Sequence, residues 1–159
     1  MYFPLAFIFI TLEVYLLMDL DSKYIQKTPN SSDHFVTDNG ELFAGHHYLI
    51  DMWNCRYLED DKIIQDILIV SAKAAGATVL HAHTHHFGVG QGVSGVVILA
   101  ESHISIHTWP ERNFVAFDIF MCGETNPDLS LRVLENEFKP TKINIKKMKR
   151  GLISKNNDQ

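Results

Sequence analysis

Hydrophobic and polar residues alternate along most of the chain from residue 42 onward, in segments of strand length. The segments rich in Val, Ile and Phe predict strands over 43–53, 77–87, 93–100, 103–109 and 113–121. Residues 142–149 also alternate, and their lysines are typical of an edge strand.

Two segments have helical spacing instead. Apolar side chains recur every three or four positions over 61–75, between Asp60 as N-cap and Gly76 beyond the last turn. A second helix begins at Asn126 with Pro127 in its first turn and runs to about Phe138. This order of elements predicts an α+β fold, a two-layer sandwich with a mostly antiparallel sheet and helices on one face.

The first 41 residues differ from this pattern. Residues 2–18 are apolar, but the run is short for a membrane span, Glu13 interrupts it, and no Lys or Arg precedes it. Membrane contact by this segment is therefore not favoured. Residues 19–41 are polar and are interpreted as a linker, which leaves 42–159 as the folded domain.

Composition adds modest constraints. A chain of 159 residues has the length of one domain, and two cysteines are typical of a protein kept in the reducing cytoplasm. The net charge is −5, although residues 139–157 carry seven basic and no acidic side chains. This basic end is interpreted as a solvated strand and tail, so no nucleic-acid partner is expected.

Two motifs with familiar spacing are rejected. Residues 90–95 match G-x-G-x-x-G, but a strand follows where a dinucleotide site needs a helix. A backbone that must approach a neighbour closely explains these glycines better. His81, His83 and His85 share one face of a strand, but its ends lie about 13 Å apart, too far for one ion. No metal site is expected.

A third candidate combines Glu101-Ser102 with His107 and Cys122. Ser102 and His107, five residues apart across an expected bend, could form a nucleophile and its base. No G-x-S-x-G motif supports a hydrolase.

The residues around this candidate form a long motif. The run from Gly92 to Glu111 (GVSGVVILAESHISIHTWPE), followed by AFDIFMCG ending at Gly123, closely resembles the prokaryotic pyruvoyl-dependent S-adenosylmethionine decarboxylase proenzymes. Residues 45–55 and 74–80 are similar to other parts of that family, and the resemblance extends over about 42–138.

The resemblance implies self-cleavage between Glu101 and Ser102. Ser102 would attack the Glu101 carbonyl, and Ser102 would end as a pyruvoyl group, the cofactor that forms a Schiff base with the substrate amine. Ser94 would help to hold the tetrahedral species, and His107 would be the processing base. A bent, strained peptide is expected at the scissile bond.

The same resemblance implies the decarboxylation of S-adenosylmethionine for spermidine synthesis by a homodimer of processed protomers, with sites near the subunit interface. Cys122 would return a proton to the substrate, Glu111 would bind the ribose hydroxyls, and Phe87 would stack on the adenine. The loop at 88–92 is one residue longer than in the family and lacks its proline.

Two alternatives remain open at this point. The altered loop is compatible with a pyruvoyl-dependent arginine or ornithine decarboxylase. A non-catalytic binding protein that never cleaves itself is the other.

Overall fold

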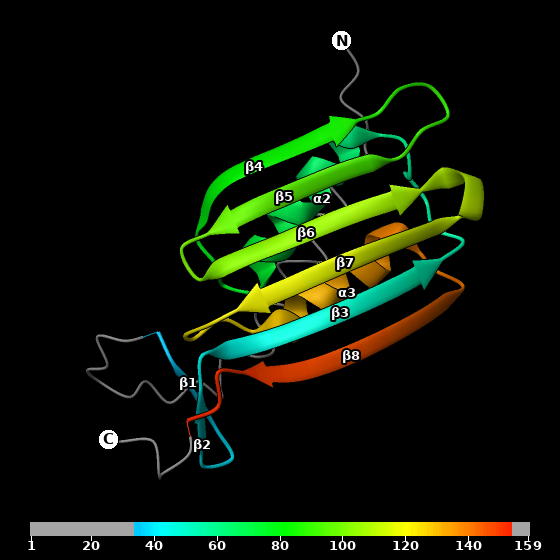
Figure 1. The fold of residues 1–159 in the computed structure, drawn as a ribbon. Helices are drawn as coiled ribbons and strands as arrows, with labels where there is room; N and C mark the ends of the chain where they lie inside the picture. Colours follow the sequence, from blue (N-terminus) through cyan, green and yellow to red (C-terminus); the bar gives the residue numbers. More distant parts are fainter. Residues whose placement is uncertain (1–33, 154–159) are drawn as a thin grey trace. The chain divides into compact units, whose positions relative to one another are not determined.

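The structure is a computed structural model and describes residues 34–153. A six-stranded sheet, antiparallel at every pairing and ordered β4-β5-β6-β7-β3-β8, forms its centre (Figure 1). The strands are β3 (Gly45–Trp53), β4 (Val79–His86), β5 (Val93–Leu99), β6 (Ser102–Trp109), β7 (Phe114–Met121) and β8 (Lys142–Arg150). Because β8 ends the sheet, its lysines protect an edge strand, as predicted.

Both helices begin and end where the sequence predicted. Helix α2 (Asp61–Ala74) is capped by the Asp60 side chain, which accepts from the Ile63 N–H, and Gly76 beyond it has a φ of 78°. Helix α3 (Pro127–Phe138) is capped by Asn126. These side chains satisfy backbone groups that an isolated helix end would leave unpaired.

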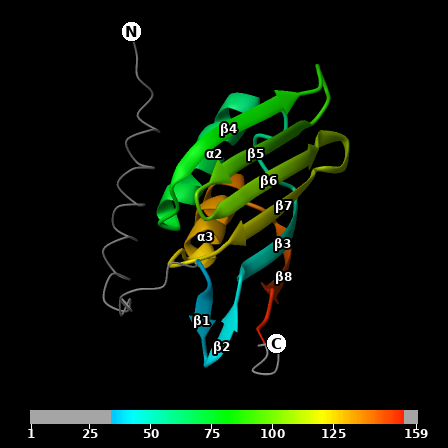
Figure 2. The same cartoon turned by 60° about the vertical axis from the view of Figure 1, so that its left-hand side comes forward.

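The two helices cover one face of the sheet, as Figure 2 shows from the side. Alternate side chains of every central strand point to them, and the core holds apolar residues such as Ile50, Ile104, Phe117, Leu68 and Leu134. No helix among residues 34–153 covers the opposite face. The α+β sandwich with helices on one face is therefore confirmed.

A short hairpin precedes the sheet. Strands β1 (Val36–Asp38) and β2 (Glu41–Phe43) pair antiparallel, although the sequence interpretation placed 36–41 in a linker and joined Phe43 to β3. Lys149 of β8 fastens the hairpin, since its Nζ lies 2.8 Å from carboxylate oxygens of both Asp38 and Glu41. This end of the expected linker is thus ordered.

The apolar segment 2–18 and most of the linker lie outside the described residues. Among residues 34–153, no helix is long and apolar enough to cross a membrane.

Candidate active site

The expected scissile bond lies at the exit of a tight turn. Ala100 and Glu101 form the two-residue connection between β5 and β6, and Leu99 pairs with Ser102 across it. Ser102 has a φ of 123°, a conformation that only glycine adopts readily. Such a residue costs about 1–3 kcal/mol and persists only when its surroundings enforce it. The strain expected from the sequence is therefore present at Ser102.

The carbonyl of Glu101 accepts two hydrogen bonds from one residue. The backbone N–H of Cys122 donates to the Glu101 oxygen at 3.0 Å, and the Cys122 thiol donates to it at 3.2 Å. Both donors come from the residue that follows β7, which pairs with β6 so that Met121 lies opposite Ser102. Two donors on one carbonyl oxygen polarise it and would stabilise an oxyanion formed there.

Ser94 and His107 form a second polar pair. They face each other across β5 and β6, and the Ser94 Oγ lies 2.8 Å from the His107 Nδ1. The sequence predicted this pair only as members of a longer motif, without their contact.

The position of His107 corrects one prediction. No bend separates it from Ser102, because both belong to the continuous strand β6. Five residues of strand correspond to about 16 Å, so His107 cannot reach Ser102 within one protomer. The candidate site is thus divided between the two ends of β6.

The His107 end of β6 borders a cavity of about 310 Å³. Its walls bring together four predicted site residues and four other residues: Phe87, Ser94, His107 and Glu111, with Gln91, Gly92, Thr108 and Trp109. This volume falls at the lower end of the range for small-molecule pockets. Aromatic surface and a carboxylate are combined here, a set that can bind a nucleoside by stacking and by accepting from hydroxyls.

Phe87 occupies the rim of this cavity. Its side chain is 60% exposed and lies edge-on to His85, with 4.8 Å between the ring centroids. The Phe87 N–H donates to the carbonyl of Gly92 at 3.1 Å and closes the loop at 88–92. An exposed ring held at a closed loop is accessible for stacking.

Gly92 packs directly against the end of β6. A Cβ at this position would lie 1.9 Å from the backbone oxygen of Thr108, so no other residue fits without displacing the strand. Thr108 fixes the same junction, since its buried hydroxyl accepts from the Val93 N–H at 2.7 Å and donates to the Leu58 carbonyl at 2.6 Å. Close approach of the backbone, predicted from the glycines, is confirmed at Gly92.

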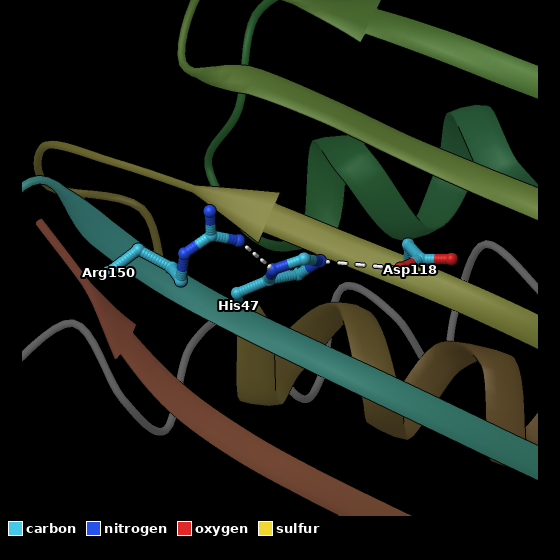
Figure 3. A network of polar contacts seen from close by, with 3 residues as sticks. All are labelled: His47, Asp118 and Arg150. Atoms are coloured by element: carbon cyan, nitrogen blue, oxygen red, sulfur yellow. Dashed lines mark hydrogen bonds and ion pairs between the residues drawn. The ribbon is translucent and has the colours of Figure 1, made fainter.

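A polar network on the face of the sheet without helices was not predicted from the sequence. Figure 3 shows His47 of β3 between Arg150 of β8 and Asp118 of β7, at 2.9 Å and 3.3 Å. Because arginine only donates, the His47 Nδ1 accepts from Arg150 and its Nε2 donates to Asp118. The three residues are far apart in sequence, so only the strand order could have indicated the network.

Two other side chains, His103 and Cys55, have pKa values shifted from the usual ones. Burial, with a smaller contribution from the neighbouring His47, lowers the pKa of His103. Burial also raises the pKa of the Cys55 thiol to about 11, which keeps it protonated at neutral pH. Cys55 is partly buried and packs against the core.

Within the described part of the chain, no group of His, Cys, Asp or Glu side chains is arranged to hold a metal ion. The G-x-G-x-x-G match runs into β5, so it has no helix to receive a phosphate.

Comparison with known proteins agrees with this geometry. The family model for S-adenosylmethionine decarboxylase matches residues 46–151. The S-adenosylmethionine decarboxylase proenzyme of Methanococcus vannielii is 42% identical over 112 residues, covering 69% of this chain and 91% of the relative. That of Thermodesulfovibrio yellowstonii is 42% identical over 118 residues, covering 72% and 87%.

A solved structure is also similar. The crystal structure of the adenosylmethionine decarboxylase from Aquifex aeolicus superposes with a TM-score of 0.63 at 30% sequence identity, covering 74% of this chain and 98% of that one. The family match extends past the predicted limit of residue 138 and includes β8. This chain belongs to the S-adenosylmethionine decarboxylase family.

Proposed function

We propose that the chain is a self-processing decarboxylase of S-adenosyl-L-methionine that makes a pyruvoyl group from its own Ser102. The observation that carries the proposal is the state of the Glu101–Ser102 peptide. Ser102 is strained at a φ of 123°, and both donors of Cys122 polarise the carbonyl that its hydroxyl must attack. Strain in the peptide and stabilisation of the oxyanion both lower the barrier to attack.

The proposed cleavage proceeds in three balanced steps, which consume one water and release one ammonia. The Ser102 Oγ bonds to the Glu101 carbonyl carbon, and the peptide C–N bond breaks, so that the amide becomes an ester and a free amine. Removal of the Ser102 α-proton then expels the Glu101 carboxylate and leaves dehydroalanine. Water replaces its nitrogen, which leaves as ammonia, and a pyruvoyl group remains at the start of the second fragment.

The residues at the turn fit a pyruvoyl group. When present, this group supplies an electrophilic carbonyl that accepts the electron pair of the bond between the substrate α-carbon and its carboxyl group. The other steps belong to the chain's own residues. Cys122, whose thiol already points at the turn, returns a proton to the substrate α-carbon. Glu111 and Phe87 bind the nucleoside part at the cavity.

The division of the site supports a homodimer. Ser102 and Cys122 lie at one end of β6, whereas Ser94, His107 and the cavity lie at the other. A two-fold axis perpendicular to β6 near its middle and parallel to the sheet would exchange these ends and would place the Ser102 end of each β6 beside the His107 end of its partner. The face of the sheet without helices would then be buried between the two copies.

The substrate assignment depends on the cavity. Its aromatic walls, Phe87 and Trp109, suit a purine ring, and Glu111 suits ribose hydroxyls. Arginine or ornithine has no nucleoside that would occupy the aromatic walls and Glu111 together, and the relatives compared above carry the name of the adenosylmethionine enzyme. The product, S-adenosylmethioninamine, would serve spermidine synthesis in the cytoplasm, where the free thiols of Cys55 and Cys122 stay reduced.

Intact mass of the purified protein tests the proposal. We expect two fragments, 1–101 and 102–159, with the second blocked by a pyruvoyl group, whereas Ser102→Ala stays whole. Released carbon dioxide is then measured with S-adenosylmethionine, arginine and ornithine as separate substrates. A wild-type chain that never cleaves would leave only the binding-protein alternative, and activity on arginine or ornithine alone would overturn the substrate assignment.

A further inference from the structure

The side chain of Glu101 makes a contact that the proposed cleavage chemistry does not require. Its Oε2 accepts a hydrogen bond from the backbone N–H of Thr78 at 2.8 Å. A second hydrogen bond links Thr78 to the preceding residue in the opposite direction: the Ala100 N–H donates to the Thr78 carbonyl at 2.9 Å. The turn that precedes the scissile bond is thus held to the start of β4 by two hydrogen bonds.

Thr78 is a rigid anchor for this contact. It follows the end of α2, where the Ala77 N–H donates to the Ala72 carbonyl at 3.0 Å and Gly76 adopts a φ of 78°. This arrangement is a Schellman motif, which fixes the chain as it leaves the helix. The Ala75 carbonyl in turn accepts from the Asn126 N–H at 2.9 Å, so the ends of both helices meet beside Thr78.

Glu101 is therefore held on two sides. Its backbone oxygen is bound by Cys122 at the end of β7, and its side chain is bound by Thr78 at the start of β4. Between two such anchors the turn cannot rotate to relieve the strained φ of the next residue, Ser102.

We propose that the Glu101 carboxylate is a positioning residue for self-cleavage, which holds the 100–101 turn against Thr78 so that the strain at Ser102 stays in the scissile peptide. The inference rests on the proposed cleavage. The bond to Thr78 involves neither the attacked carbonyl nor the breaking C–N bond. Cleavage therefore leaves it intact, and it anchors the new carboxyl terminus of the first fragment.

The length and the charge of the side chain at position 101 can be varied separately. Glu101→Gln keeps a side-chain oxygen at the same distance without the charge, whereas Glu101→Asp keeps the charge on a side chain one methylene shorter. The contact requires a side chain long enough to reach the Thr78 N–H. Glu101→Asp and Glu101→Ala are therefore expected to cleave about tenfold more slowly, the effect of losing one hydrogen bond to a charged group. Glu101→Gln is expected to restore cleavage to within about threefold of wild type.

The experiment follows the uncut fraction of freshly refolded full-length protein by intact mass. Thr78→Ala retains the backbone donor and is the matched control, with an expected rate equal to wild type. Thermal unfolding of each variant in a Ser102→Ala background shows whether a slow variant is merely misfolded. Equal cleavage of wild type and Glu101→Asp, or a defect in Glu101→Gln as large as in Glu101→Ala, would overturn the role of Glu101. A wild-type chain that does not cleave would instead overturn the proposed function.

Discussion

Cys122 donates both its backbone N–H and its thiol to the carbonyl oxygen of Glu101. One residue at the end of β7 is thus placed to act in two reactions at different times. Under the proposed function it would polarise the attacked carbonyl in the uncut chain, and after cleavage its thiol would be free to donate a proton to the substrate.

Replacement of Cys122 by Ala separates these two roles. The backbone donor remains, so we expect cleavage to proceed to completion but about tenfold more slowly. Decarboxylation is expected to fall by about 10²–10⁴-fold, the contribution of a positioned general acid. Intact mass follows the first reaction and released carbon dioxide the second. Normal turnover in the cleaved variant would move the acid to another residue.

Replacement of Ser102 by Gly tests the strain directly. Neither Ser102→Gly nor Ser102→Ala has a hydroxyl, so both stay uncut and can be compared as single chains. Only glycine adopts a φ of 123° without penalty, so Ser102→Gly is expected to be the more stable by about 1 kcal/mol. Urea unfolding of the two proteins measures the difference. A more stable Ser102→Ala would show that the turn is relaxed.

Mixed dimers test whether His107 acts on the partner. We expect His107→Ala to cleave slowly by itself and Ser102→Ala not at all. In a co-expressed mixture, the His107→Ala chain retains Ser102 and receives an intact His107 from its partner, so this chain is expected to be cleaved. Differently tagged chains and intact mass identify which one is cut. Absence of cleavage in verified mixed dimers would contradict the shared site.

The half-buried His46 predicts a dependence of stability on pH. Burial lowers its pKa below the usual 6.5; Asp38 and Asp128 oppose this shift, and Lys149 and Lys147 reinforce it. Between the lowered pKa and 6.5 the unfolded chain binds more protons than the folded one. Stability is therefore present above pH 6.5 and is lost as the pH falls through this window.

The measurement is urea unfolding of Ser102→Ala protein at several pH values between 5 and 8. In the same background, His46→Gln is expected to flatten the profile, because glutamine does not titrate. An identical profile in both proteins would assign the loss to other groups.

Local features of the fold could be predicted because their causes are local. Asp60, Gly76, Asn126 and Pro127 mark helix ends through contacts within a few residues, and the sequence placed all four correctly. The hairpin of β1 and β2 could not be found this way, because its short strands depend on Lys149, more than a hundred residues away.

The sequence motif and the expected geometry of the candidate site compare differently with the structure. Phe87, Ser94, His107 and Glu111 do line one cavity. The distance between Ser102 and His107 was misjudged, although the predicted strand over 103–109 already implied a long separation. A motif gives the identity of neighbouring residues, but only strand direction tells which of them can touch.

The position of the turn at residues 100–101, outside the strand pairing, affects how the protein would refold after the proposed cleavage. The pairing between β5 and β6 extends from Leu99–Ser102 to Ser94–His107 and excludes both turn residues. The proposed cut would remove the covalent link at this turn and the Ser102 nitrogen, while the pairs from Ile98–His103 to Ser94–His107 would remain, so that the mature fold would be an assembly of two polypeptides. Its refolding then depends on an encounter between fragments and on their concentration. Maturation is in this sense a one-way step, because an unfolded mature protein no longer carries the connection that first aligned β5 with β6.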